Sequence, residues 1–459
     1  MNRSVLVVIA FLAGCATTEP YERPSVELPA AWKESGPRYA QDGRWWGVYG
    51  DPLLERVVEE ALKNNADLAI AVARVDEARA LIREVESGFL PTLDAQGGAA
   101  RQQVSTRSAV AAPGMPREFS TYRGTLNLSY EVDLFGRVRA SARAAQADLE
   151  ATEAAREGVR LAVAAEVAKS YFTLRALDEQ VQLTRESITL REDALVLQRK
   201  RRDAGIASEF EFRQLEAEAA VLRTQLPPLE RAREAEEAAL SVLLGRTPRE
   251  VFEGRVARKA SSDEGPGAPV VPAGMPSELL LRRADLVEAE RRLAAANARI
   301  AAARAEMFPS IALTAALGSE SASLSNLFSS GAGIWSLGLA LTQPIFAGGR
   351  LEARTEAAQA RERQLLAGYR KTIQTAFSEV RAAISAQARA RESYDAESAR
   401  AAALAETARL ARLRYDNGVA SQLDVIDAER GLLAARSARI EALRAYRAAV
   451  ADLFRALGG

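Results

Sequence analysis

Two stretches of about seventy residues each contain no proline, and they constrain the fold more than any other feature. They run over about 137–204 and 350–417, and their only interior glycines are Gly158 and Gly368. Ala, Leu, Arg and Glu dominate both stretches, and these residues are strong helix formers. A helix of that length extends roughly 100 Å and needs partner helices along its course. Taken alone, the two stretches are also compatible with a plain coiled-coil dimer.

Matching landmarks occur twice along the chain, which indicates an internal duplication. Three pairs of segments match in the same order: "FLPTLDAQG" (89–97) with "MFPSIALTAA" (307–316), "YEVDLFGR" (130–137) with "LTQPIFAGGR" (341–350), and "RRDAGIASEFEF" (201–212) with "RYDNGVASQLDV" (414–425). One structural unit is therefore expected to be used twice.

These landmarks give the expected domain layout. An export signal occupies 1–14, and an N-terminal segment follows at 15–50. The first repeat covers 51–244 and the second covers 277–459. The segment 245–276 contains several Pro and Gly residues, which are typical of a linker.

Each repeat contains segments in which apolar and polar residues alternate. "YRGTLNLSYEVDL" (122–134) has charged and amide side chains on one face and apolar side chains on the other, and "IWSLGLALTQP" (334–344) repeats the alternation. Period two predicts strands. The expected strands lie at about 92–106, 119–134, 310–322 and 333–345.

Strands of this length and pattern are compatible with a soluble sandwich or with a transmembrane barrel. Charged residues on the polar face favour the barrel, because a sandwich would bury that face. Four strands cannot close on themselves, and open strand edges in lipid leave backbone groups unpaired. We therefore expect several copies of the chain to share one sheet.

The residue types that are scarce exclude most catalytic chemistry. The chain has 61 basic and 61 acidic residues, no histidine, and one cysteine, Cys15. The charge balance argues against a nucleic-acid interface. Imidazole catalysis, histidine-ligated metal sites and disulfides are excluded. No catalytic residue, cofactor or metal site is predicted, and we expect a protein that is not an enzyme.

The N-terminus "MNRSVLVVIAFLAGC" has the pattern of an export signal, with Arg3 ahead of a short apolar run. "LAGC" at 12–15 resembles a bacterial lipobox, whose cysteine is lipidated after cleavage. Cys15 is therefore the predicted lipidation site, and Ala16 after it resembles lipoproteins sent to the outer membrane. An ordinary signal that leaves Cys15 unmodified is the alternative.

Together, these motifs resemble the outer-membrane efflux protein family, the TolC-like or OprM-like channels, in the lipoprotein branch that serves RND-type efflux systems. The resemblance rests on the duplicated layout, on Pro91 and Pro309 before the strands, and on "DLFGR" (133–137) and "LFRALGG" (453–459). It implies a mainly α protein with a membrane β-barrel portion. Three copies would form a twelve-stranded outer-membrane barrel and a long helical barrel in the periplasm. The implied partners are a periplasmic adaptor protein, an inner-membrane RND pump and outer-membrane lipid.

The repeated Gly motif corresponds in this family to the periplasmic tip, where each long helix turns back. Gly205 and Gly418 are expected to stop the two long helices in a left-handed conformation. Ser208 and Ser421 follow at positions suited to capping the returning helices.

By the same resemblance, the periplasmic gate falls on Asp424, Asp427, Tyr415 and Glu211. Asp424 and Asp427 match acidic residues that constrict the tunnel, and Tyr415 matches a tyrosine that helps to hold it closed. Ala420 stands where relatives often carry a basic residue, so the partner of the tyrosine is open. Like charges in a ring repel, which predicts cation preference and sensitivity to pH and divalent ions. Carboxylates three residues apart on an exposed helix are also common without such a role.

The predicted function is the passive outer-membrane channel of a tripartite efflux pump. An exit duct for type I secretion or for metal efflux is an alternative within the same class. A periplasmic adaptor or scaffold that does not conduct is the alternative from another class.

Overall fold

The computed structural model describes residues 21–25, 44–105, 117–258 and 282–459. The chain is mainly helical with one small sheet, as the resemblance implies. Two compact units are present, and each combines segments from both repeats. Among the described residues, the first unit contains 21–25, 74–105, 117–153 and 288–370, and the second contains 44–73, 154–258, 282–287 and 371–459. Cys15 lies outside the described residues.

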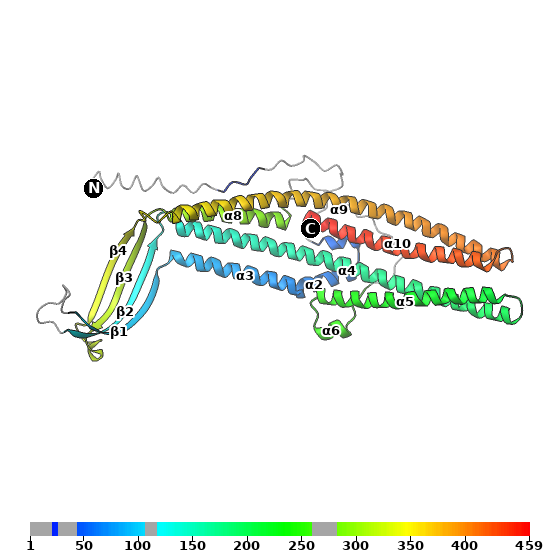
Figure 1. Cartoon of the computed structure of the whole chain (residues 1–459), viewed down its shortest axis with the longest axis horizontal. Helices are drawn as coiled ribbons and strands as arrows, with labels where there is room; N and C mark the ends of the chain where they lie inside the picture. The colour runs from blue at the N-terminus through cyan, green and yellow to red at the C-terminus, as the bar shows by residue number, and fades with distance from the viewer. Residues whose placement is uncertain (1–20, 26–43, 106–116, 259–281) are drawn as a thin grey trace. The chain divides into compact units, whose positions relative to one another are not determined.

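The sheet belongs to the first unit and contains the four expected strands in antiparallel order (Figure 1). These are β1 (Thr92–Gln103), β2 (Glu118–Val132), β3 (Ser310–Ser321) and β4 (Gly333–Thr342). β2 pairs with β3, which joins the two repeats, and Tyr130 lies opposite Leu313. Within the part of the chain that the structure describes, β1 and β4 form the two edges of this sheet.

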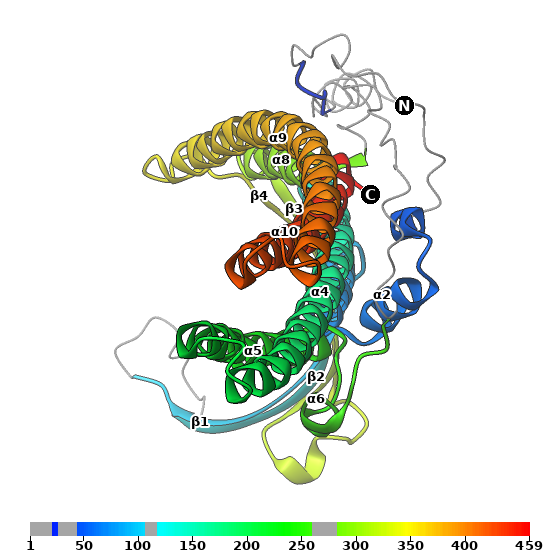
Figure 2. The same ribbon diagram turned by 90° about the vertical axis from the view of Figure 1, so that its right-hand side faces the viewer.

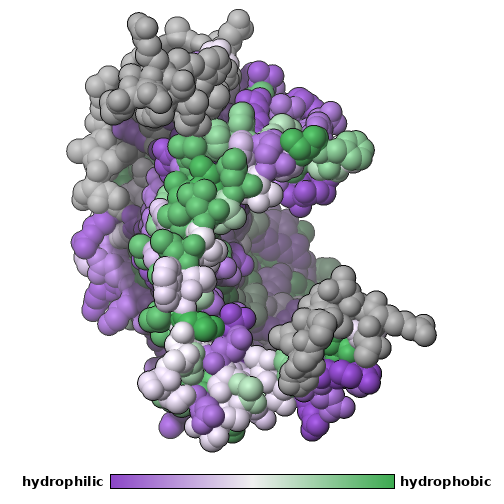
Figure 3. Space-filling model, turned by 90° about the vertical axis from the view of Figure 1, so that its left-hand side faces the viewer, coloured by the Kyte–Doolittle hydropathy of each residue, from purple (hydrophilic) through white to green (hydrophobic). Residues whose placement is uncertain are grey.

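The two faces of the sheet differ in polarity, as the alternation predicts. Tyr130, Leu313 and Leu339 lie opposite one another in one row. The next row, on the other face, contains Ser129 and Thr314. The apolar side chains of β4 are largely exposed, and the view toward the sheet shows hydrophobic residues gathered on this end beside strongly hydrophilic ones (Figure 3). Among the described helices, none is long and apolar enough to cross a membrane.

The two proline-free stretches form helices of 67 residues each, α4 (Arg137–Asp203) and α9 (Arg350–Asp416). α5 (Glu209–Leu243) lies beside the end of α4, and α10 (Gln422–Leu457) lies beside the end of α9 (Figures 1 and 2). The other α-helices among the described residues are α2 (Pro52–Asn64), α3 (Ala66–Glu86), α6 (Pro248–Glu253) and α8 (Ala284–Ala305). Each long helix thus has a return helix in the same chain, in place of the coiled-coil dimer that the sequence alone allowed.

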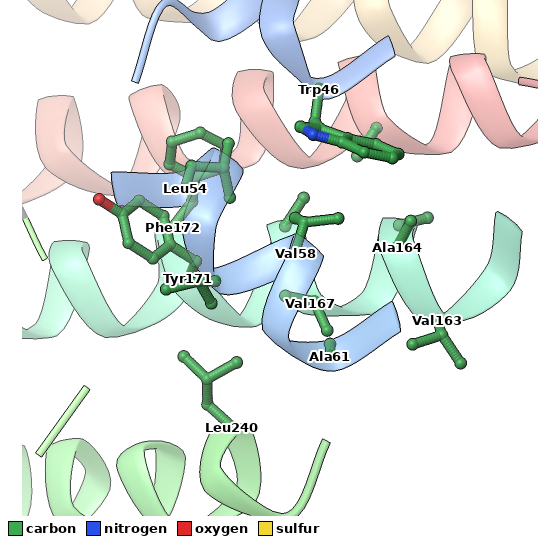
Figure 4. Close-up of a cluster of buried hydrophobic side chains, with 14 of the residues drawn as sticks. Trp46, Leu54, Val58, Ala61, Val163, Ala164, Val167, Tyr171, Phe172 and Leu240 are labelled. Atoms are coloured by element: carbon green, nitrogen blue, oxygen red, sulfur yellow. The ribbon is translucent and has the colours of Figure 1, made fainter. Parts of the chain in front are cut away.

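The core of the second unit surrounds α2, which packs against α4 and α5 (Figure 4). Its members include Val58, Val167, Phe172 and Leu240, all buried. Asp51 begins α2 by accepting hydrogen bonds from the backbone of its first turn. Burial of such a cluster is the main stabilising contribution in a helical protein of this kind.

The aromatic segment before α2 packs on α10. It forms the short helix η1 (Trp45–Tyr49), where Trp45 stacks on Phe454 at 5.3 Å between ring centroids. The Tyr49 hydroxyl donates to the backbone oxygen of Arg447 at 2.7 Å. The segment therefore contacts α10 through both an aromatic ring and a hydrogen bond.

Candidate functional site at the helical tips

The turns that follow α4 and α9 share one backbone design. Gly205 and Gly418 have φ of 75° and 73°, the left-handed conformation expected for them. The amide of Ile206 donates to the Arg201 carbonyl at 2.8 Å, and Val419 repeats this bond at the second tip at 2.9 Å. This pattern is a Schellman motif, and it satisfies carbonyls that the end of a helix leaves unpaired. Both long helices therefore stop by the same mechanism.

The return helices also start in the same way. Ser208 accepts from the Glu211 amide at 3.2 Å, and the Glu211 carboxylate accepts from the Ser208 amide at 3.0 Å. Ser421 and Asp424 form the same reciprocal pair, at 3.3 and 2.8 Å. These capping boxes fix the first turn of α5 and of α10. Two of the predicted gate residues, Glu211 and Asp424, thus cap the return helices.

The cap changes the acidity of Asp424. Hydrogen bonds from the backbone amide of Ser421, and then from its hydroxyl, lower the pKa of the Asp424 carboxyl below its ordinary value of 3.8. Donors to a carboxylate favour its charged form. Both bonds go to the same oxygen, Oδ2, so that the side chain is held toward Ser421. Asp424 is therefore charged at neutral pH.

A hydrogen bond joins the two tips. The Arg201 guanidinium at the end of α4 donates to the Tyr415 hydroxyl at the end of α9, at 2.5 Å. Its central carbon lies 5.5 Å from the centroid of the Tyr415 ring, within the range of a cation–π contact. Arg201 thus places a positive charge beside Tyr415. Sequence analysis missed it because Arg201 stands inside a run of four basic residues, 199–202.

Asp427 lies one turn beyond Asp424 and is more loosely held. Its side chain is 62% exposed and lies 3.6 Å from Arg430, three residues further along α10. Arg430 also forms an ion pair with Glu218 of α5. Exposed pairs of this kind constrain a side chain weakly. Of the predicted acidic residues, Asp427 is therefore the one that is not held by a helix cap.

A buried ion pair behind the tips was not predicted. Arg191 of α4 contacts Glu429 of α10 at 2.8 Å, and the two side chains are 8% and 16% exposed. Arg412 of α9 approaches the other Glu429 oxygen at 3.5 Å. One carboxylate therefore connects three helices. Charged residues are too common in these helices for the sequence to single out this pair.

An antiparallel sheet with an exposed apolar face and two long helical hairpins with linked polar tips define a class of protein, the outer-membrane channels with a helical periplasmic part. The chain belongs to the outer membrane efflux protein family, whose model matches residues 57–246 and 275–459. It is an outer-membrane channel component, with its helical part in the periplasm.

Individual relatives agree with this membership. The antibiotic efflux pump outer membrane protein ArpC of Pseudomonas putida is 35% identical, over 100% of this chain and 96% of the relative. A toluene efflux pump outer membrane protein, TtgC, also of Pseudomonas putida, is 34% identical over the same shares. The outer membrane channel CmeC of Campylobacter jejuni superposes with a TM-score of 0.88 at 26% identity, covering 97% of this chain and 94% of that one.

Proposed function

We propose that three copies of the chain form a twelve-stranded barrel in the outer membrane and one continuous periplasmic tunnel. A periplasmic adaptor protein and an inner-membrane RND pump would deliver cargo to it, and the tunnel would conduct passively. The exposed apolar face of the sheet and its two open edges support this assembly. Lipidation of Cys15 would add a second attachment to the membrane, since one acyl chain alone anchors weakly.

We propose that the pump, and not this channel, selects the cargo. Relatives named for antibiotics and for toluene resemble the chain to the same degree, over its whole length. Cargo of such different chemistry fits a tunnel that admits small organic molecules in general.

We propose that the turns at the ends of α4 and α9 form the gate of the channel. The main observation in support is the hydrogen bond between Arg201 and Tyr415. This bond joins the ends of the two long helices, so that opening the tips outward requires breaking it. A hydrogen bond with a charged donor contributes about 1.5–3 kcal/mol. Asp424 and Asp427 would add a ring of negative charge when three copies meet. Repulsion within the ring would oppose closure, and the Arg201 bond would favour it.

Single-channel recording in planar bilayers tests this proposal. We expect the native channel to show small, cation-selective steps. Asp424→Asn/Asp427→Asn removes both charges while keeping an oxygen that can accept the capping bonds. Its steps should be larger and less selective for cations.

The matched control is Glu253→Gln in α6, which removes an exposed charge far along the chain from either tip motif. Its conductance and selectivity should equal those of the native channel. Selectivity unchanged in the double variant would remove Asp424 and Asp427 from the gate. A folded, membrane-inserted oligomer without any conductance would refute the channel assignment itself.

A further inference from the structure

A cavity of about 240 Å³ lies in the first unit, where the sheet meets the starts of α4 and α9 and the end of α8 (Figure 1). Ser310 of β3 and Thr342 of β4 lie opposite each other at this end of the sheet and line the cavity. Glu131 of β2 also lines it and belongs to the same face of the sheet, because it pairs with Ala312. The cavity therefore lies on the polar side of the sheet.

The walls of the cavity also contain apolar surface. Phe135 and Phe308 both line it and stack on each other, with ring centroids 5.0 Å apart. Phe308 is 40% exposed, so part of its ring is free for further contact. Pro309 and Leu351 extend this apolar wall. A small ligand can therefore bury an apolar body here.

Each acid that lines the cavity already has an arginine partner. The pairs are Glu131 with Arg137, Asp133 with Arg139 and Glu306 with Arg354. Arg350 lines the cavity as well, and its exposed side chain has no hydrogen bond or ion pair within the described part of the chain. The described residues thus leave one positive charge in excess at the cavity.

The duplication explains this excess. Matching Phe135 to Phe346 aligns Glu131 with Thr342, and the Gly-Arg pair that follows aligns Arg137 with Arg350. In the first repeat, Nε and Nη2 of Arg137 donate to the two carboxylate oxygens of Glu131, at 2.9 and 2.7 Å. The second repeat retains the arginine, but Thr342 has a hydroxyl in place of the carboxylate. Arg350 thus corresponds to a carboxylate-binding arginine whose own carboxylate is missing.

We propose that the cavity binds a small organic carboxylate, with its carboxyl group on Arg350 and its apolar body on Phe308 and Leu351. A guanidinium binds a carboxylate through two parallel hydrogen bonds, as Arg137 does in the first repeat. A cavity of about 150 Å³ can hold benzene, whereas sites for drug-sized ligands begin at about 300 Å³. The cavity therefore suits a single ring with its carboxyl group, such as benzoate.

Binding goes beyond the proposed channel function, because it needs residues of only one copy. In the proposed trimer, the polar face of the sheet would line the water-filled interior of the barrel. An organic anion would then pass the cavity on its way outward. This placement rests on the proposed assembly, whereas the binding itself does not.

Binding of para-fluorobenzoate to the purified full-length protein, followed by fluorine NMR, tests the proposal. The native protein should bind the probe saturably, and unlabelled benzoate should displace it. Para-fluorobenzyl alcohol and para-fluorobenzylamine have the same ring without the negative charge, so they should bind about tenfold more weakly or less. Equal binding of the three probes would overturn the assignment of a carboxylate.

Two substitutions place the binding at this cavity. Arg350→Ala should weaken the binding of para-fluorobenzoate by about tenfold or more, because it removes the charged donor. Arg361→Ala is the matched control: Arg361 is another exposed arginine of α9 without a described side-chain partner, and it lies outside the cavity lining. Its binding should equal that of the native protein.

A third substitution recreates the pair of the first repeat. Thr342→Glu supplies an internal carboxylate to Arg350 and should abolish binding of the probe. Thr342→Gln adds similar bulk without the charge and should weaken binding clearly less. Equal losses in the two variants would contradict the replacement of a carboxylate by the ligand.

The failure of this site and the failure of the channel can be told apart. Absence of saturable binding to the native protein, or equal binding by Arg350→Ala, would overturn the site. Single-channel conductance is measured without benzoate, so it tests the channel independently. If Arg350→Ala does not fold, the three probes on the native protein and the Thr342 variants still decide the proposal.

Discussion

The two tips have the same backbone and different side chains. Both end a 67-residue helix with a left-handed glycine, and both start the return helix with a serine capping box. At corresponding positions, however, the first tip has Arg202 and the second has Tyr415. The two repeats therefore share the glycine turn and the capping box, whereas the side chains on the surface of the two tips differ. The divergence made the tips complementary, with the donor Arg201 on one and the acceptor Tyr415 on the other.

The same contrast holds about two turns behind the tips. Glu429 on α10 and Glu216 on α5 occupy corresponding positions. Glu429 pairs with the buried Arg191, whereas Glu216 forms an exposed pair with Arg213 of its own helix. Similar sequence thus produces a buried connection in one repeat and a surface contact in the other.

The largest difference between the repeats should come from these glutamates. Glu429→Ala leaves the Arg191 guanidinium buried without its main partner, which costs about 3 kcal/mol or more. Glu216→Ala breaks an exposed pair and should cost less than about 0.5 kcal/mol. Hydrogen exchange measured by mass spectrometry should show faster opening of α10 in the first variant and little change of α5 in the second. Equal effects in the two helices would contradict the assignment of a buried role to Glu429.

A smaller difference is expected for the arginines at corresponding positions, Arg201 and Arg414. Arg201→Ala removes the bond between the tips and should raise the ratio of open to closed channel by about tenfold or more. The Arg414 guanidinium donates to the carbonyl of Val419 in its own turn at 3.5 Å and interacts with the charge of Asp424 at the same tip, so Arg414→Ala should change the ratio little. Single-channel open probability measures both. A larger effect from Arg414 would move the latch away from the Arg201–Tyr415 pair.

The helices and strands were predictable because they depend on local pattern. The long helices begin at Arg137 and Arg350, where the sequence analysis placed their starts, since a glycine directly before each start and strong helix formers after it act locally. β1 was expected as the hairpin partner of β2, although its own alternation is poor. Local rules still fail in places: α5 continues through Pro227 and Pro228, which remove helix hydrogen bonds.

The site was only partly predictable, because its contacts connect distant residues. Tyr415, Asp424 and Glu211 were placed at the tips through the repeated motif and the resemblance. Their partners depend on which helix faces cross in space, and no spacing in the sequence encodes that. The pairing of Arg201 with Tyr415 is of this kind, 214 positions apart along the chain. The capping role of Asp424 was within reach, since Ser followed three residues later by an acidic residue is a local signal.

The shared backbone predicts similar effects at the two caps. Ser208→Ala removes the bond that the Ser208 hydroxyl accepts from the Glu211 amide. Ser421→Ala removes the corresponding bond and also the bond that the Ser421 hydroxyl donates to Asp424. Each variant should cost about 1 kcal/mol in the local opening of the return helix. Hydrogen exchange of the first turns of α5 and α10 measures this cost. Ser208→Thr and Ser421→Thr keep the hydroxyl and serve as controls with little change. A clearly larger effect at one tip would show that the two turns are not equivalent in the assembled protein.

The smallest expected effect is the pH dependence of the second cap. The folded pKa of Asp424 is lowered by the bonds from Ser421, so the stability it contributes is fully present above its ordinary value of 3.8. That stability is lost only as the pH falls through the lowered folded value. Opening of the first turn of α10, corrected for intrinsic exchange, should therefore be constant from pH 7 to pH 5.

Asp424→Asn is the control for this titration, because its side chain keeps an acceptor oxygen and carries no charge. Its opening should lack the change that the native protein shows at acidic pH. Loss of protection in the native protein between pH 6 and pH 5 would contradict the lowered pKa. It would instead mean that Asp424 carboxylates of neighbouring copies face one another, since nearby like charges favour the protonated form. The same titration thus distinguishes an Asp424 that only caps its helix from an Asp424 that also belongs to the ring.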